Sequence, residues 1–301
     1  MKWKKLGKII EQQKHLSWMH SHTMLPVVDH LEEDLYRIYF CGRDKGNRSL
    51  IGFAEVNLSD PFGACKYADK PAFSLGELGC FDDNGVSPSS LVRVGNQKYL
   101  YYIGWKPRST TRFGLIAGLA VSDDDGLSFY RESRAPILQV SDKEPISILT
   151  APFVLKEDDE WKMWYVSGKK WINPDLPTYN IKYATSNDGV NWVQTGIVCI
   201  ENRDEESALA RPFVLKEDGI YKMWYSYKYK SNPYTIGYAE SLDGIKWQRK
   251  DSEAGISVSK SGWDSEMIEY ACVFNHKDKK YMLYNGNGYG ENGIGLAILD
   301  E

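Results

Sequence analysis

The chain contains an internal repeat, and this repeat constrains its fold more than any other feature. Residues 152–158 recur without change as residues 212–218, and each copy is followed by Lys-Met-Trp-Tyr. Both copies then contain Ser-x-Asp-Gly-x-x-Trp, which ends at Trp192 in one and at Trp247 in the other. A repeat of this length indicates that one supersecondary unit is used several times.

Weaker copies extend the series in both directions. The aromatic stretches at residues 36–40, 99–102 and 281–284 correspond to the Met-Trp-Tyr segments. The chain therefore holds five units of about 55 to 65 residues. Each unit is predicted to form short strands, because aromatic and β-branched runs favour strands and Asp-Gly supplies the positive φ of tight hairpins.

Four-stranded sheets that repeat radially are typical of a β-propeller, which leaves only short edges exposed. The sequence therefore predicts an all-β fold, a five-bladed β-propeller with four-stranded antiparallel blades, as a single domain over residues 1–301. The fifth unit ends directly after its third strand, so we expect residues 3–10 to supply its outermost strand. A solenoid is the alternative, but neither end carries a polar capping unit.

Composition excludes several classes of partner. With 37 basic and 41 acidic residues the net charge is −4, which argues against a nucleic-acid binder that relies on clustered Lys and Arg. No apolar run approaches the roughly 20 residues that span a bilayer, and the basic start lacks the apolar stretch of a secretion signal. The five cysteines show no CxxC spacing. We expect a cytoplasmic protein with no membrane partner, no metal and no cofactor; its oligomeric state is left open.

The aromatic strand, the Tyr-Ala-x-Ser-x-Asp-Gly-x-x-Trp hairpin and the apolar inner strand together resemble the five-bladed β-propeller glycosidase superfamily. That superfamily includes arabinanases, invertases and mannoside phosphorylases. The resemblance covers about residues 18–299 and looks nearest to an uncharacterised bacterial glycosidase-like group, through residues 21–22, 43–49, 81–86 and 263–267. It implies a carbohydrate-active enzyme that cleaves or transfers a glycosidic bond in a central funnel.

The chain departs from this family where the catalytic carboxylates stand, at the start of the inner strands. The corresponding positions hold Met24, Thr150 and Ala210, and Ser21 stands where the invertase nucleophile would be. Only the fifth unit has an acid there, Glu269. The known acid/base set therefore does not transfer to this chain.

Residues that enter the inner strands of a propeller point into the mouth of its funnel. Glycosidic cleavage needs one protonated carboxyl for the leaving oxygen and one ionised carboxylate as nucleophile or base. We expect Glu269 and Asp83 to be the principal carboxylates, although Asp83 also fits a turn sequence. The supporting catalytic candidates are Glu266, Asp44 and His22.

Two kinds of side chain are expected to bind the substrate. Arginines hold carboxylates or phosphates through two parallel hydrogen bonds, and loop aromatics stack on sugar rings. The predicted binding residues are Arg43, Arg48, Arg211, Asp82, Trp105, Trp171, Tyr179, Trp263, Asp264 and Tyr289. Each kind of residue also has a structural interpretation without a ligand. The arginines could belong to a hairpin, the aspartates could form a turn or a cap, and the aromatics could pack within the blades.

Three functions remain open at this point. A glycoside hydrolase-like enzyme would use the converging carboxylates, whereas a phosphorylase would use the arginine cluster to hold inorganic phosphate. A non-catalytic propeller that binds a glycan or nucleotide sugar would keep the aromatics and lack an acid pair. In each case the expected partner is a carbohydrate or an activated sugar.

Overall fold

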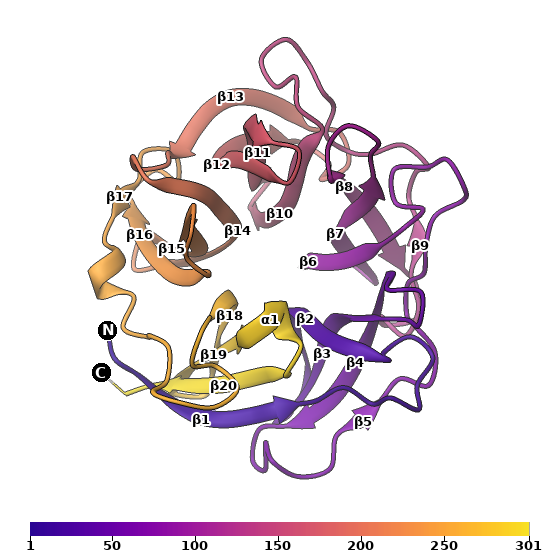
Figure 1. The fold of residues 1–301 in the computed structure, drawn as a ribbon. Coiled ribbons are helices and arrows are strands. Elements are labelled where there is room, and N and C mark those ends of the chain that lie inside the picture. The colour runs from indigo at the N-terminus through magenta and orange to yellow at the C-terminus, as the bar shows by residue number, and fades with distance from the viewer. Residues whose placement is uncertain (301) are drawn as a thin grey trace.

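The protein is almost entirely β-structure arranged around a central axis (Figure 1). The computed structural model describes residues 1–300. The strands form five antiparallel groups, and the first strand of each group lies nearest the axis (Figure 1). The groups are β2 (Ser21–Glu32), β3 (Leu35–Arg43), β4 (Ser49–Asn57) and β5 (Lys66–Tyr67); β6 (Val86–Val94), β7 (Gln97–Pro107), β8 (Phe113–Ser122) and β9 (Tyr130–Arg131); β10 (Ile148–Glu157), β11 (Glu160–Asn173), β12 (Leu176–Ser186) and β13 (Val193–Ile200); β14 (Glu206–Glu217), β15 (Ile220–Tyr229), β16 (Thr235–Ser241) and β17 (Gln248–Arg249); and β18 (Glu269–His276), β19 (Lys279–Asn285), β20 (Ile294–Leu299) and β1 (Trp3–Ile10).

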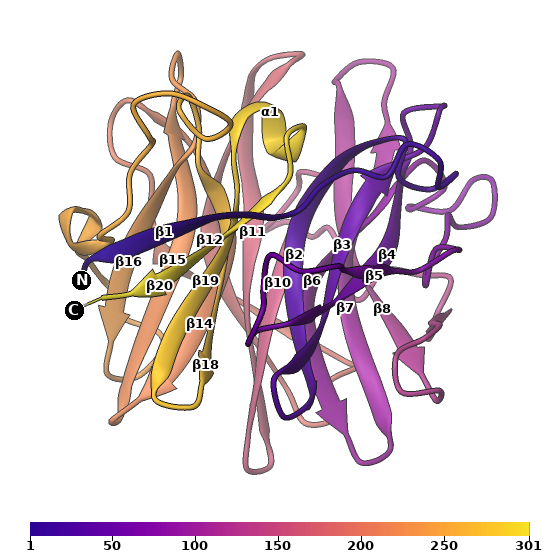
Figure 2. The same ribbon diagram turned by 90° about the horizontal axis from the view of Figure 1, so that it is seen from below.

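The N-terminal strand β1 lies at the outer edge of the last group. It pairs antiparallel with β20, so that Trp3 lies opposite Leu299 and Ile10 opposite Ile294. Trp3, Ile9 and Ile10 are buried. The two ends of the chain therefore lie side by side at the rim of the molecule (Figure 2).

Two short helical segments complete the structure. The 3-10 helix η1 (Asp251–Glu253) precedes the fifth group, and the one-turn helix α1 (Asn287–Gly290) lies between β19 and β20. Within residues 1–300, no helix has the length and apolar character needed to cross a membrane.

The Asp-Gly hairpins form as the sequence predicts. Gly189 and Gly244 have φ values of 76° and 73°, which residues with a Cβ rarely adopt. Asp188 and Asp243 each accept hydrogen bonds from the following backbone N–H groups. The carbonyl oxygen of Gly244 also accepts a hydrogen bond of 2.7 Å from the indole of Trp164. The recurrent motif therefore builds the hairpin and ties it to the neighbouring group.

Each inner strand carries a β-bulge at the same place. The pairing with the second strand shifts in all five groups, at 24–27, 88–90, 150–153, 210–213 and 269–272. In four of them the bulge holds a residue of positive φ, at Leu25 (59°), Ala151 (49°), Arg211 (48°) and Tyr270 (58°). A bulge re-aims a side chain and often lies beside a functional site.

Toward the other end of the strands, polar side chains connect neighbouring groups. In each case a side chain near the end of one inner strand contacts an equivalent position on the second strand of the next group. We call these the inter-group contacts: Lys98 Nζ to Asp29 Oδ2 at 2.5 Å, Tyr221 Oη to Glu157 Oε2 at 2.5 Å, Lys280 Nζ to Glu217 Oε2 at 2.5 Å, and Tyr36 Oη to His276 Nδ1 at 2.9 Å.

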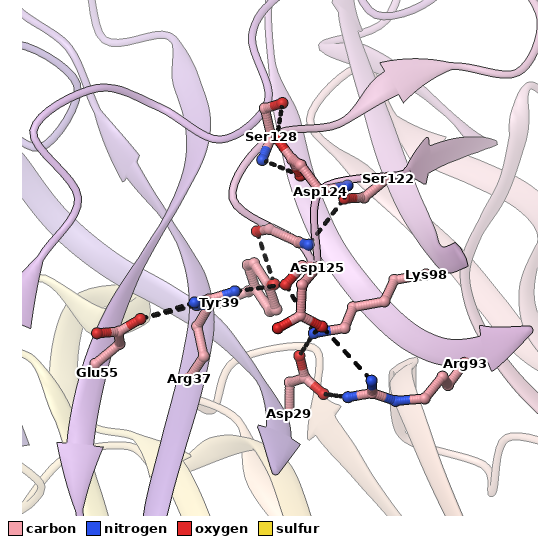
Figure 3. A network of polar contacts seen from close by, with 11 residues as sticks. Asp29, Arg37, Tyr39, Glu55, Arg93, Lys98, Ser122, Asp124, Asp125 and Ser128 are labelled. Atoms are coloured by element: carbon pink, nitrogen blue, oxygen red, sulfur yellow. Dashed lines mark hydrogen bonds and ion pairs between the residues drawn. The ribbon is translucent and has the colours of Figure 1, made fainter. Parts of the chain in front are cut away.

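The contact around Lys98 is part of a larger ionic cluster (Figure 3). Lys98 is 1% exposed and also forms an ion pair of 2.6 Å with Asp125. Arg93 pairs with both aspartates, and Arg37 binds the Asp125 carbonyl oxygen at 2.6 Å. Each cation here therefore faces at least one oxygen acceptor, as buried charges require.

Candidate functional site

A cavity of about 440 Å³ lies on the central axis, where the inner strands begin. Four inner strands each contribute a residue at the beginning of the bulge or directly before it. These residues are Met24, Ser87, Thr150 and Ala210. The four bulge residues of positive φ described above also line it. The repeated bulge is thus the local feature that builds the cavity wall.

The charged residues of the cavity wall are mainly basic. They are Arg43 at the end of β3, Arg112 just before β8, Arg211 in β14 and Lys228 in β15, with Asp175 as the one carboxylate among the described lining residues. Asp175 is exposed, in the turn between β11 and β12. The chain is acidic overall, so this local excess of positive charge is a property of the site.

Arg211 lies at the bottom of this cavity, where it reaches across the axis. Its guanidinium Nη2 donates hydrogen bonds of 2.9 Å to the carbonyl oxygens of Pro26 and Ser89, which belong to two other strand groups. Nε and Nη1 have no hydrogen-bond partner among residues 1–300. Burial lowers the pKa of Arg211 to about 10, which keeps the group charged at neutral pH.

One side of the cavity is a cluster of tyrosines, Tyr179, Tyr234, Tyr270 and Tyr289. The hydroxyls of Tyr179 and Tyr234 lie 2.9 Å apart, and the rings of Tyr270 and Tyr289 lie 6.3 and 6.2 Å from that of Tyr234. Lys228 Nζ lies 5.0 Å from the Tyr234 ring centroid. The cluster offers aromatic faces and hydroxyls beside a cation.

Glu269 is fully buried at the start of β18, beside this tyrosine cluster but outside the cavity lining. Neither carboxyl oxygen has a hydrogen-bond partner within the described residues. Burial raises the pKa of Glu269 well above its usual value, against the opposing charge of Lys228. Burial therefore favours the protonated acid.

Asp82 and Asp264, predicted to bind substrate, are instead held by residues of their own strand groups. Asp82 accepts hydrogen bonds from Arg131 at 2.7 Å and from Tyr102 at 2.9 Å. Asp264 is bound in the same way by Lys5 at 2.5 Å and by Tyr284 at 3.0 Å. A buried carboxylate needs a cation and hydrogen-bond donors close to it. Asp82 and Asp264 therefore each stabilise the loop that leads into the inner strand of their own group.

Four further candidates also lie away from the cavity lining. Asp83 accepts hydrogen bonds from Lys106 at 3.0 Å and from the Gly79 N–H at 2.8 Å. Burial by itself raises the pKa of Asp83, but the hydrogen bonds from these donors outweigh it and lower the pKa. Asp44 binds Arg48 Nη2 at 2.7 Å across a turn. Glu266 is exposed. Asp83, Asp44 and Arg48 therefore bind neighbouring residues within turns, which is the alternative to substrate contact that the sequence left open.

His22 lies close to the cavity but does not line it. Its Nδ1 is 3.0 Å from the Ser21 hydroxyl. Burial and the nearby charge of Arg43 lower the pKa of His22 to about 4. The imidazole is therefore neutral at pH 7.

The loop aromatics divide into two sets. Trp105, Tyr179 and Tyr289 line the cavity. Trp171 packs on Phe113, with ring centroids 5.3 Å apart, and Trp263 stacks on Tyr284 at the same distance. The last two therefore pack against the protein, which is the alternative that the sequence left open.

Sequence reasoning missed several lining residues, Arg112, Asp175, Lys228, Tyr234 and Tyr270. Tyr270 follows Glu269 at the bulge, so alignment of the inner strands could have found it. Arg112, Asp175 and Lys228 come from segments that differ between repeats, and only the folded chain brings them together.

Solved structures share the fold of this chain. A solved glycoside hydrolase superposes with a TM-score of 0.79 at 17% identity, covering 98% of this chain and 90% of its own. A Bombyx mori GH32 β-fructofuranosidase in complex with sucrose has a TM-score of 0.66 at 14% identity, covering 96% and 63%. No family model matches the chain. The protein has the propeller fold of the glycoside hydrolases.

One relative is close in sequence along its whole length. The Uncharacterized protein Rv1502 of Mycobacterium tuberculosis is 40% identical over 303 residues, which cover 100% of each chain. The chain belongs to the same family as this mycobacterial protein.

Proposed function

We propose that this chain is a carbohydrate-active, single-domain propeller of five blades, closed by β1, whose central cavity takes a negatively charged sugar. The observation that carries the proposal is the cavity wall itself, with four cationic side chains and one exposed carboxylate among its described residues. Cations in a partly dry concavity attract anions strongly. A neutral glycan would leave these charges without partners, at a cost in binding energy.

The tyrosine cluster supports a sugar as the rest of the ligand. Its aromatic faces suit the apolar faces of a pyranose ring, and its hydroxyls can bind sugar hydroxyls. A propeller of the same fold, the β-fructofuranosidase, has been solved with sucrose. That likeness concerns the fold alone, so the ligand proposal rests on the cavity.

Catalysis would use Glu269 as the acid. Burial favours the protonated form of its carboxyl, which lies beside Tyr270 and Lys228, two residues of the cavity lining. It would donate a proton to the leaving glycosidic oxygen as the bond to the anomeric carbon breaks. The incoming nucleophile is inorganic phosphate, which attacks the anomeric carbon as an anion and needs no carboxylate base. Hydrolysis would also need an ionised carboxylate to take a proton from water, and Asp175 is the one carboxylate among the described lining residues.

The first test is isothermal titration calorimetry with glucose, glucuronate, glucose 1-phosphate and glucose 6-phosphate. We expect an anionic sugar to bind at least tenfold more tightly than glucose, because one charge-assisted hydrogen bond contributes about 1.5–3 kcal/mol. Equal affinity for glucose and for all three anionic sugars would contradict the proposal.

Turnover provides a second test. Glu269→Gln keeps the shape of the side chain but cannot donate a carboxylic proton. We expect it to reduce cleavage of aryl glycosides or sugar phosphates at least about 100-fold while ligand affinity changes little. Measuring the wild-type rate with and without inorganic phosphate separates phosphorolysis from hydrolysis. Full activity of the variant would remove Glu269 from the mechanism.

A further inference from the structure

The floor of the cavity contains hydrogen-bond donors that the protein itself leaves unused. Arg211 is 1% exposed, yet only its Nη2 is bound, while Nε and Nη1 face no acceptor among residues 1–300. Buried polar atoms in folded proteins are almost always hydrogen-bonded. A buried guanidinium with two unused donor nitrogens therefore indicates a missing acceptor.

No counter-charge compensates for Arg211 inside the described protein. The ionisable groups that act on it are Cys272, Tyr270 and Cys41. Burial raises the pKa of both thiols to about 11 and that of the phenol well above its usual value, so all three are neutral at pH 7. This differs from Arg249, a half-buried arginine of the same strand group that pairs with Glu206 and Asp251.

Thr150 presents a second unused donor at the same floor. It lines the cavity just before the bulge of β10, is 4% exposed, and its Oγ1 has no partner within the described residues. At this position Thr150 supplies a hydrogen-bond donor without a negative charge. This donor makes the floor suitable for an anion.

From these residues we propose that Arg211 and Thr150 form a phosphoryl-binding site at the floor of the cavity. Nη1 of the Arg211 guanidinium and the Thr150 hydroxyl can each donate a hydrogen bond to a different oxygen of one phosphoryl group. Arg43 and Lys228 line the same cavity, so the total positive charge suits a dianion better than a single carboxylate. The proposal rests on the proposed function and names the anionic group that it requires.

Two molecules carry this chemistry, a phosphorylated sugar and free inorganic phosphate. With the phosphoryl group at the floor, a sugar would extend toward Tyr179 and Tyr234 on the cavity wall. Free phosphate would occupy the same donors as an incoming nucleophile. Titrations with each molecule separate the two sources.

The test uses the full chain and isothermal titration calorimetry with inorganic phosphate, glucose 1-phosphate, glucose 6-phosphate, glucuronate and glucose. Thr150→Val is nearly isosteric and removes no hydrogen bond within the protein, so its fold should survive. Arg211→Lys keeps the charge but loses the planar guanidinium and its unused Nη1 donor. Arg134→Lys is the control, because Arg134 is exposed and pairs with Glu77 at 2.6 Å.

We expect wild type and Arg134→Lys to bind a phosphoryl compound equally. Thr150→Val should weaken that binding about tenfold, and Arg211→Lys at least tenfold. If both Thr150→Val and Arg211→Lys fold and bind phosphoryl compounds as tightly as wild type, the site is overturned. Binding of glucuronate without any phosphoryl compound would also overturn it, yet leave the anionic-sugar function standing. Binding of inorganic phosphate alone would support the site and count against that function.

Discussion

Lys98 and Arg211 are both buried cations, but they lie in two regions that treat charge in opposite ways. Lys98 has two aspartates within 2.6 Å as part of the inter-group contacts, whereas Arg211 has, among residues 1–300, only two carbonyl oxygens and leaves its Nε and Nη1 donors unused. Paired charges maintain the arrangement of the strand groups. Unpaired charges oppose folding and retain the capacity to bind a ligand. The difference separates the structural end of the molecule from its candidate functional end.

The largest expected effect comes from removing β1, which tests whether the inter-group contacts can hold the strand groups together alone. Deletion of residues 1–10 exposes β20 and removes the buried side chains of Trp3, Ile9 and Ile10. At about 1.5–3 kcal/mol for each large buried side chain, we expect the thermal midpoint to fall by more than about 10 °C. A melting curve like that of the full chain would show that β1 is dispensable.

The second prediction contrasts the two cations directly. Lys98→Met leaves Asp29 buried without its lysine and should cost about 3–5 kcal/mol of unfolding free energy. Arg211→Met removes two hydrogen bonds but also an uncompensated charge, so we expect less than half that loss. Urea denaturation at pH 7 measures both variants, and equal losses would erase the distinction between the regions.

The third prediction concerns pH, because acids in the two regions have pKa shifts of opposite sign. Burial by itself raises the pKa of Glu157, but hydrogen bonds from Lys162, Lys216 and Tyr221 outweigh it and lower the pKa to about 2. Its contribution to stability is therefore present above the ordinary value of 4.5 and is lost as the pH falls toward 2. Glu269 is the reverse: its raised pKa makes folding less favourable as the pH rises above 4.5, because only the unfolded chain ionises.

The measurement is urea denaturation between pH 2.5 and 8, at roughly half-unit steps. Glu157→Gln should be destabilised at pH 7 and converge on wild type at low pH. Glu269→Gln should gain stability relative to wild type as the pH increases above about 4.5. Parallel pH profiles for the two variants would contradict the opposite treatment of charge.

The smallest expected effect lies within the cavity wall. Tyr179→Phe removes one hydroxyl, which contacts Tyr234 at 2.9 Å, and leaves the aromatic face in place. We expect stability to change by about 1 kcal/mol or less and sugar affinity to fall about three- to tenfold. An unchanged affinity, measured by calorimetry, would place the sugar away from this wall.

Much of the candidate site could not be predicted from the sequence. Asp82 and Asp264 stand before inner strands, as funnel residues should, but Tyr102 and Tyr284 bind them elsewhere. A repeat unit shows which residues precede a strand; it does not show which cation or hydroxyl lies within 3 Å. The predicted carboxylates therefore lie outside the cavity lining, whereas Arg211, Trp105, Tyr179 and Tyr289 line it.

By itself, the sequence determined that the chain repeats one β-unit and that Asp-Gly hairpins connect its strands, because these features depend on local backbone preference and on hydrophobic pattern. It also indicated that this chain has an acid at only one of the inner-strand positions where the resembled families are expected to carry their catalytic carboxylates. Only the tertiary structure decided which charges are satisfied, because pairing depends on atoms that are distant along the chain. Asp29 and Lys98, 69 residues apart, neutralise one another, whereas Arg211 meets the carbonyls of two distant strands and keeps two unused donor nitrogens among residues 1–300. These unused donors, and with them the case for an anionic ligand, exist only in the folded chain.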